Sequence, residues 1–462
     1  MTPSGLIFAA AALLLLARVA LGPLEFIRSP LNAESVAAVT LFLTLLYRAN
    51  GKREPEPSRA PAWLPAIGAV IVIAAFLPGV TAPLVHDGYS HIGRVSSESW
   101  TELIRSTLVR PAPGDDPFFR PLAYITYWID SRWAGFHAVP WHLWNLAVHL
   151  VNCALVWILA RRLALGRLPA GVAALIFALH GTRPEVVSWA GARFDLLATL
   201  FVLAALLAAE RMAPLWMVAV FTALALLSKE SAFTLPLLIA LLILFKPELD
   251  RRRILQSALT AAGVCAAFLI YRTWFLGGIG GYTTISGTPS IFEFNPILSA
   301  KALFYRQWGI LFFPINWSAE PGIVLKTAAA VMLLAAALFL QYCRARRRFL
   351  AASLAFVIIA VLPAQHLLLI GADLSGARIL YLPAAGLALF WGFALEGIEG
   401  ARLQIALAAG LLAFQITALE HNLRIWRNVA IEAQRICRDF GREIASDPRP
   451  VVTPRNFQFA AR

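Results

Sequence analysis

The sequence predicts an all-α, polytopic membrane protein, and three observations support this fold class. Of the 462 residues, 59% are hydrophobic and only 14% are charged, whereas soluble proteins average about 45–50% and about 25%. The apolar residues gather in runs close to the roughly 20 residues that a helix needs to cross hydrocarbon. The net charge of +14 comes mainly from basic clusters between these runs, the pattern of cytoplasmic loop ends. This composition excludes a soluble enzyme, a disordered chain and a disulfide-rich secreted module, and it argues against a nucleic-acid partner.

About thirteen apolar segments are long enough to serve as transmembrane helices, singly or inside a bundle. The expected spans are 5–22, 34–48, 61–80, 141–160, 168–181, 195–209, 213–228, 231–246, 254–275, 323–342, 348–369, 379–395 and 403–420. Two helices and a basic cytoplasmic loop therefore make up residues 1–60. A transmembrane domain follows over 61–420, and a short extracytoplasmic tail is expected over 421–462.

The basic residues orient these helices, because short cytoplasmic loops carry an excess of Lys and Arg. The clusters are Arg48, Lys52, Arg53 and Arg59; Arg161, Arg162 and Arg167; Arg251, Arg252 and Arg253; and Arg344, Arg346, Arg347 and Arg348. All four fall on one side only if segment 299–315 dips in and returns, or lies along the interface. The amino terminus is then inside. The composition favours a bacterial inner membrane, with the endoplasmic reticulum as the alternative.

The longest outer segment, 81–140, is expected to form interfacial structure. Residues 97–109 could make a short amphipathic helix. Residues 118–133 are aromatic with few charges, as in a helix at headgroup depth.

Most of the unusual polar residues map to the outer side, next to the ends of predicted spans. They are His86, Asp87, His91, Arg120, His137, His142, His180, Glu185, Arg193, Asp195, Lys229, Glu230, His366, Arg378 and His421, with His149 two turns inside a span. Ionisable groups at membrane depth are costly and mark functional sites. This one-sided distribution predicts a polar site at the outer interface.

Asp87 is the most specific candidate within that site. It lies in Leu-Val-His-Asp-Gly-Tyr-Ser-His, where an apolar helix meets the outer surface. A partly desolvated carboxylate beside a phosphate-binding cation could accept a proton from an alcohol. The alternative is a helix-end aspartate without a chemical role, and position alone leaves both open.

Two further charged groups have structural alternatives. If the chain is helical here, Glu185, Trp189 and Arg193 lie four residues apart and share one face, either as part of a site or as a buried Glu–Arg pair. Lys229 and Glu230 separate two apolar helices. They could instead be a snorkelling lysine and a first-turn glutamate.

No cofactor is expected. His86, Asp87 and His91 are close in sequence, but their spacing specifies no ligand geometry, and no H-E-x-x-H or Cys/His set occurs. A divalent metal ion remains the alternative. The chain also has no Walker loop, dinucleotide fingerprint or G-x-S-x-G motif, which argues against a soluble nucleotide donor.

Five motifs in order resemble the GT-C superfamily of polytopic glycosyltransferases, and within it the protein O-mannosyltransferase-like enzymes that carry tetratricopeptide repeats. The motifs are Leu84-Val85-His86-Asp87-Gly88; Phe119-Arg120-Pro121-Leu122 followed by His142, Asn145 and His149; residues 180–198; Leu227-Ser228-Lys229-Glu230-Ser231; and Arg378-Ile379-Leu380-Tyr381-Leu382-Pro383. They span roughly residues 80–385. The resemblance implies a GT-C-like fold whose first catalytic loop is extracytoplasmic.

The resemblance also implies a polyprenyl-phosphate-linked sugar donor and a hydroxyl acceptor. Asp87 would be the general base of an inverting transfer, and Arg120, Arg193, Lys229 and Arg378 would bind the donor phosphate. The residues expected to bind substrate or support the site are His86, His142, His149, His180, Glu185, Asp195, Glu230 and Tyr381.

Three departures and three rival functions qualify this expectation. The family often shows two adjacent acids where this chain has Asp87-Gly88, and residues 181–184 disturb its His-Pro-x-His pattern. No repeat domain follows the last span, so the acceptor (protein, lipid or glycan) stays open.

The rivals are a surface-polysaccharide polymerase or ligase, a lipid or sugar transporter, and a non-catalytic scaffold.

Overall fold

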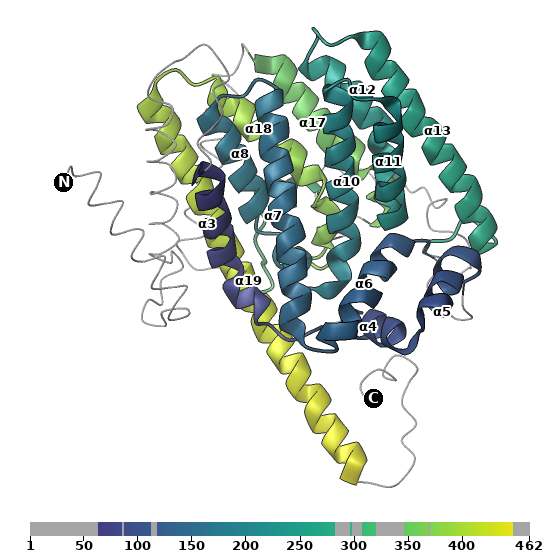
Figure 1. Cartoon of the computed structure of the whole chain (residues 1–462). Coiled ribbons are helices and arrows are strands. Elements are labelled where there is room, and N and C mark those ends of the chain that lie inside the picture. Colours follow the sequence, from purple (N-terminus) through teal and green to yellow (C-terminus); the bar gives the residue numbers. More distant parts are fainter. Residues whose placement is uncertain are drawn as a thin grey trace.

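The computed structural model describes residues 63–85, 87–111, 118–281, 296–297, 307–319, 346–367 and 370–446. Within these ranges every regular element is a helix and no strand occurs (Figure 1). The prediction of an all-α protein is therefore confirmed for this part of the chain. The expected spans 5–22, 34–48 and 323–342 lie outside the described residues.

The other ten expected spans each correspond to an apolar helix. These are α3 (Trp63–Val80), α7 (Ala138–Arg162), α8 (Arg167–Leu179), α10 (Arg193–Glu210), α11 (Leu215–Ser228), α12 (Leu235–Phe245), α13 (Arg251–Leu276), α17 (Arg347–Val361), α18 (Pro383–Glu396) and α19 (Ala401–Ser446). In the described part, five helices are long and apolar enough to cross a membrane, and five more apolar helices are shorter. The chain has the character of a multi-pass membrane protein.

Short connections pack successive helices side by side, so the bundle has two distinct ends. The basic loops that the structure describes, around residues 161–167, 246–253 and 346–348, gather at one end, where the buried carboxylate of Glu210 bridges α7 and α12. The basic cluster before residue 60 lies outside the described residues. Glu210 pairs with Arg162 at 2.5 Å and with Lys246 at 2.8 Å. At this end too, Glu396 of α18 accepts the Gly166 N–H, at 2.7 Å. We call this end the basic end.

The opposite end is covered by a layer of short helices that lie across the bundle (Figure 1). The layer consists of α4 (Gly88–Ser97), α5 (Trp100–Ile104), a π-helical turn η1 (Arg105–Val109) and α6 (Pro121–Ala134). The short helix expected over 97–109 begins three residues later, at Trp100, and runs to Val109 as α5 followed directly by η1. A capping box, in which Ser99 and Glu102 satisfy each other's backbone N–H groups, starts a new helix at Trp100.

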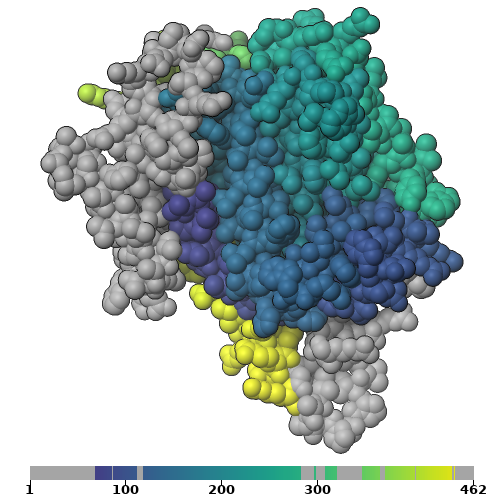
Figure 2. All heavy atoms as spheres, viewed as in Figure 1, coloured from purple at the N-terminus to yellow at the C-terminus, as the bar shows by residue number. Residues whose placement is uncertain are grey.

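Helix α19 extends far beyond its predicted end. The sequence places the end of the last span near residue 420, yet α19 continues unbroken to Ser446. Its apolar residues Leu419 and Leu423 are buried against the bundle, and Ala430 is still 1% exposed. The rest of the helix projects past the α4–α6 layer (Figures 1 and 2). The segment expected to be a tail therefore begins as a helix that braces this end of the bundle.

The described residues on either side of segment 282–306 both lie at the end opposite the basic end. Gly281 lines a cavity there, and Leu311 accepts a contact from His180 at the end of α8. The described part of 299–315, residues 307–315, contains one short helix, α15 (Trp308–Phe312).

Candidate functional site

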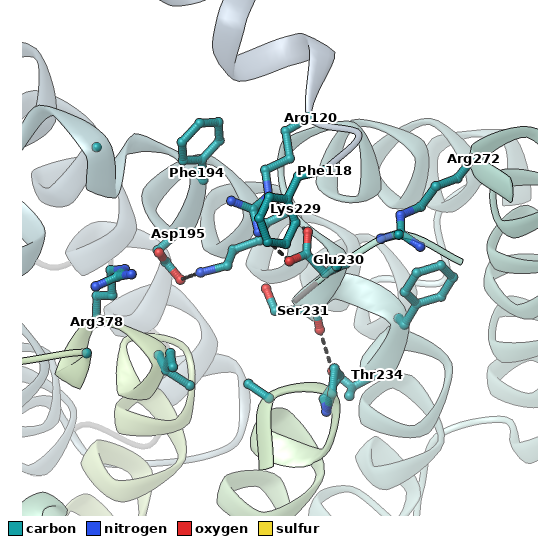
Figure 3. Close-up of a pocket in the computed structure, with 18 of the residues that line it drawn as sticks. Phe118, Arg120, Phe194, Asp195, Lys229, Glu230, Ser231, Thr234, Arg272 and Arg378 are labelled. Atoms are coloured by element: carbon teal, nitrogen blue, oxygen red, sulfur yellow. Dashed lines mark hydrogen bonds and ion pairs between the residues drawn. The ribbon is translucent and has the colours of Figure 1, made fainter. Parts of the chain in front are cut away.

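A cavity of about 760 Å³ lies at the end opposite the basic end, among the α4–α6 layer and the ends of α10, α11, α12, α13 and α17. Its charged lining residues come from six separate elements or loops and converge on one space (Figure 3). Six residues of the predicted site line it. They are Asp87, Arg120, Asp195, Lys229, Glu230 and Arg378. The structure thus brings together residues from all five sequence motifs.

Arg120 is held in place on every side. Its guanidinium donates two hydrogen bonds to the Glu230 carboxylate, one of them 2.9 Å long from Nε to Oε2. The guanidinium carbon Cζ also lies 4.2 Å from the ring centre of Phe118 and 4.9 Å from that of Phe194. A bidentate pair of this kind is geometrically specific. Arg120 therefore fastens the start of α6 to the segment between α11 and α12, with its charge already neutralised.

Lys229 forms the second ion pair of the cavity. It follows the last residue of α11 in an extended conformation, with φ −162° and ψ 144°. Because extended neighbours point in opposite directions, Lys229 and Glu230 reach different partners. The Lys229 Nζ lies 2.6 Å from Oδ1 of Asp195 (Figure 3). Asp195 stands in the first turn of α10, so this pair ties α10 to the end of α11.

Glu185 supports the cavity without lining it. Its carboxylate accepts the backbone N–H groups of Gly376 at 2.9 Å and Arg378 at 2.7 Å, and the Arg378 guanidinium lies 2.6 Å away. Glu185 therefore caps the turn that carries Arg378 and also orients its side chain. The guanidinium stacks on Trp189, 4.5 Å from its ring centre.

We expect Glu185→Gln to lower the free energy of unfolding by about 1–3 kcal/mol, the usual cost of a lost hydrogen bond to a charged group. A glutamine amide has only one oxygen, so it would accept fewer of the three hydrogen bonds that the Glu185 carboxylate accepts. It would also leave the Arg378 guanidinium without its counter-ion. The measurement is reversible unfolding of the detergent-solubilised protein. Glu432→Gln, at an exposed position of α19 whose Arg435 contact is 3.9 Å, is the matched control and should change little. Equal stability of the two variants would contradict the capping role.

The prediction that Glu185, Trp189 and Arg193 share one face of a helix is wrong. The helix α9 (Pro184–Val187) is only four residues long, and Trp189 is extended with φ −135° and ψ 120°. The indole of Trp189 folds back over Gly191, where a Cβ would come within 2.5 Å of the ring. The chain therefore turns before α10 begins at Arg193, and Glu185 and Arg193 acquire different partners.

Arg193 does not line the cavity. Its side chain is fully buried and pairs with Asp130 of α6 at 2.6 Å. The guanidinium lies 4.7 Å from the Tyr127 ring centre and 5.1 Å from that of Trp141. Its expected contact with a donor phosphate has no support in this arrangement, because aromatic rings enclose the charge. Arg193 instead joins α6 to α10.

The predicted histidines and Tyr381 also lie away from the cavity, within the packed bundle. His142 Nδ1 lies 3.0 Å from the carbonyl oxygen of Val80, and His180 Nε2 lies 2.9 Å from that of Leu311. His149 Nδ1 contacts the Tyr381 hydroxyl at 2.7 Å. These are core residues whose contacts link separate parts of the bundle, although the buried Nε2 of His142 has no hydrogen-bond partner among the described residues. His86 lies outside the described residues.

Asp87 differs from every other acid of the cavity. It occupies the N-cap position of α4, yet its side chain makes no capping hydrogen bond. The residue is exposed and lines the cavity. Among the described residues its carboxylate has no hydrogen-bond or ion-pair partner. A role confined to helix capping does not account for this geometry.

Arg272 is a cavity residue that the sequence analysis missed. It stands near the end of α13 and is only 5% exposed. Its guanidinium donates a hydrogen bond to the carbonyl oxygen of Ile279, and its Nε has no hydrogen-bond partner within the described ranges. Of the four Arg and Lys residues that line the cavity, it alone has no carboxylate partner in the described part of the chain. An arginine inside an apolar span was the available signal.

His91 is the second cavity residue to which the sequence analysis gave no role. It lies one turn after Asp87 on α4, and its backbone N–H donates to the Asp87 carbonyl at 2.9 Å. Its ring is packed against Tyr127, with ring centres 5.7 Å apart and planes 9° apart. Its Nδ1 lies 3.3 Å from the Tyr124 hydroxyl. The imidazole is thus held in a defined orientation at the cavity wall.

No protein-family model, curated protein or solved structure matches this chain. Across the described residues, no group of three or more His, Cys, Asp or Glu side chains could hold a metal ion. What the cavity can do chemically therefore follows from its own groups: an accessible carboxylate, a buried guanidinium without an acidic partner, and three ion pairs that hold the walls.

Proposed function

We propose that the protein is a membrane glycosyltransferase that moves a sugar from a polyprenyl-phosphate-linked donor to a hydroxyl acceptor. The observation that carries this proposal is the pairing, in one cavity, of the unpartnered Asp87 carboxylate with the buried Arg272 guanidinium. Proton removal from an acceptor needs the first group, and a leaving phosphate needs the second. The order of the five motifs, which resembles GT-C enzymes, supports the same reaction.

A lipid-linked donor suits the apolar part of the cavity lining. Leu237 is 54% exposed, Leu269 44% and Leu362 40%, although all three line the cavity. They belong to α12, to α13 and to the 3₁₀ turn that follows α17. Apolar side chains that are exposed at the flank of a bundle are suited to contact hydrocarbon. A polyprenyl chain could therefore approach from the bilayer while its phosphate meets Arg272.

In the proposed reaction Asp87 accepts the proton of the acceptor hydroxyl. The acceptor oxygen then attacks the anomeric carbon, and the bond from that carbon to the phosphate oxygen breaks with its electron pair on the phosphate. A single displacement inverts the anomeric centre. Arg272 compensates the charge that develops on the phosphate.

The ion pairs hold this geometry in the proposal. Lys229 and Arg378 reach the cavity from separate elements, and each holds its wall of the cavity through an ion pair with a carboxylate. Arg120, with Glu230, holds the α6 end of the cavity in place. Arg193 joins α6 to α10 behind the cavity wall and does not contact the phosphate in this proposal.

The proposed location is a bacterial inner membrane, with the cavity at the periplasmic face. The cavity lies opposite the basic end, and basic loops normally face the cytoplasm. Lipid-linked sugars presented on the outer leaflet would then reach the site. The acceptor remains a protein, a lipid or a glycan.

The test uses purified protein in nanodiscs with a panel of radiolabelled polyprenyl-phosphate sugars and a crude periplasmic extract as acceptor. Release of free polyprenyl phosphate, with transfer of label to the extract, is the expected result. No release with any sugar would refute the proposal and would favour one of the alternative functions, a polysaccharide polymerase, a ligase or a transporter.

A further inference from the structure

His91 lies on the same face of α4 as Asp87. The hydrogen bond from the His91 backbone N–H to the Asp87 carbonyl, 2.9 Å long, shows that the two residues are related by one helical turn. Side chains four residues apart on a helix lie about 5–6 Å apart at Cβ. Both side chains line the cavity. A small group such as a hydroxyl can therefore sit within reach of both.

The surroundings of His91 fix its ring without burying it completely. Tyr127 stacks on it, while Tyr124 and Phe194 present their edges at ring-centre distances of 5.6 and 5.4 Å. Tyr127 is in turn held by its hydroxyl, which donates to the Ala190 carbonyl at 2.6 Å. The His91 ring remains only partly buried and open to the cavity. A ring that only filled a core position would not need this access.

The proposed reaction leaves a task that no other described residue near Asp87 performs. Once Asp87 has taken the acceptor proton it is a neutral carboxylic acid, and it must lose that proton before the next turnover. The other described acids that line the cavity, Asp195 and Glu230, are committed to Lys229 and Arg120. Imidazole exchanges protons readily near neutral pH.

We propose that His91 is the second proton-handling residue of this site. It accepts the proton from the Asp87 carboxylic acid, which restores the carboxylate, and the resulting imidazolium releases that proton to water. No other bond is made or broken in this step. The inference rests on the function proposed above.

The test compares three histidine variants in the nanodisc assay, with radiolabelled polyprenyl-phosphate sugar at saturating concentration. His91→Gln should lower the rate of sugar transfer by about 10- to 100-fold. This is at or below the lower end of the roughly 10²–10⁴-fold that a positioned general acid or base contributes. His91→Phe, which keeps an aromatic ring for Tyr127 but has no nitrogen, should fall equally. Binding of polyprenyl phosphate should be unchanged in both. Added imidazole should restore part of the rate to His91→Ala but none to Asp87→Asn.

His421→Gln is the matched control, because His421 lies at the same end of the bundle, contacts the Asn316 carbonyl at 2.9 Å and does not line the cavity. It should transfer sugar at the wild-type rate. Wild-type activity in His91→Phe would overturn the inference and leave His91 a packing residue. Loss of polyprenyl phosphate binding in step with the rate would overturn it too. An inactive wild type would instead refute the glycosyltransferase proposal itself, and the inference with it.

Discussion

Asp87→Asn is expected to reduce the rate of sugar transfer by about 10²–10⁴-fold, the usual contribution of a positioned general base. Asparagine keeps the size of the side chain but cannot accept the acceptor proton. The fold should survive, because the Asp87 side chain neither caps α4 nor pairs with another described residue. Binding of polyprenyl phosphate should be retained. The measurement is single-turnover transfer of label beside equilibrium binding of polyprenyl phosphate.

Asp373→Asn provides the matched control for this prediction. Asp373 is an exposed aspartate at the same end of the bundle, and its carboxylate accepts the Ser375 N–H at 3.1 Å in a local turn. It does not line the cavity, so its variant should transfer sugar normally. An Asp87→Asn protein as active as this control would remove the general base from the proposal and leave Asp87 as a helix-end residue.

Arg272→Gln is expected to weaken the binding of polyprenyl phosphate by about 10- to 100-fold, which corresponds to the loss of one or two charge-assisted hydrogen bonds. The reason is the charge balance of the cavity. Arg120, Lys229 and Arg378 each face a carboxylate already. Arg272 is the cation whose charge an incoming phosphate would neutralise. Titration of the nanodisc-embedded protein with polyprenyl phosphate measures the change directly.

The control for Arg272 removes a complete ion pair. Arg120→Gln alone would leave Glu230 as an uncompensated acid in the cavity and would repel an anion for that reason. The double variant Arg120→Gln with Glu230→Gln keeps the net charge of the cavity and should bind polyprenyl phosphate more tightly than Arg272→Gln does. If the double variant lost more affinity than Arg272→Gln, Arg120 would be the phosphate ligand and the assignment of Arg272 would be wrong.

The sequence predicts the helices well because a bilayer imposes one simple rule on them. A chain that crosses hydrocarbon must satisfy its backbone hydrogen bonds within each segment, so runs of apolar residues become helices. The expected spans 254–275 and 195–209 match α13 (Arg251–Leu276) and α10 (Arg193–Glu210) to within a few residues. The boundary near residue 420 was wrong because a helix needs no hydrocarbon to continue, and α19 runs on past the end of the bundle to Ser446.

The sequence also indicates which side of the protein carries the site, because ionisable residues are too costly to scatter through hydrocarbon. Asp87, Lys229 and Arg378 were identified in this way, and all three line the cavity. The same reasoning could not separate Arg193 from Arg272. Both are arginines near the ends of spans, and only the packing encloses the first in aromatic rings and opens the second to the cavity.

By itself, then, the sequence determined the helical membrane fold, its two unlike ends and most of the polar residues gathered at one of them. Only the tertiary structure decided the pairing of charges. Glu185 meets Arg378 across 193 positions of sequence, and Arg120 meets Glu230 across 110. The physical reason is that hydrophobicity acts on each segment locally, whereas an ion pair depends on where two separate helices place their side chains.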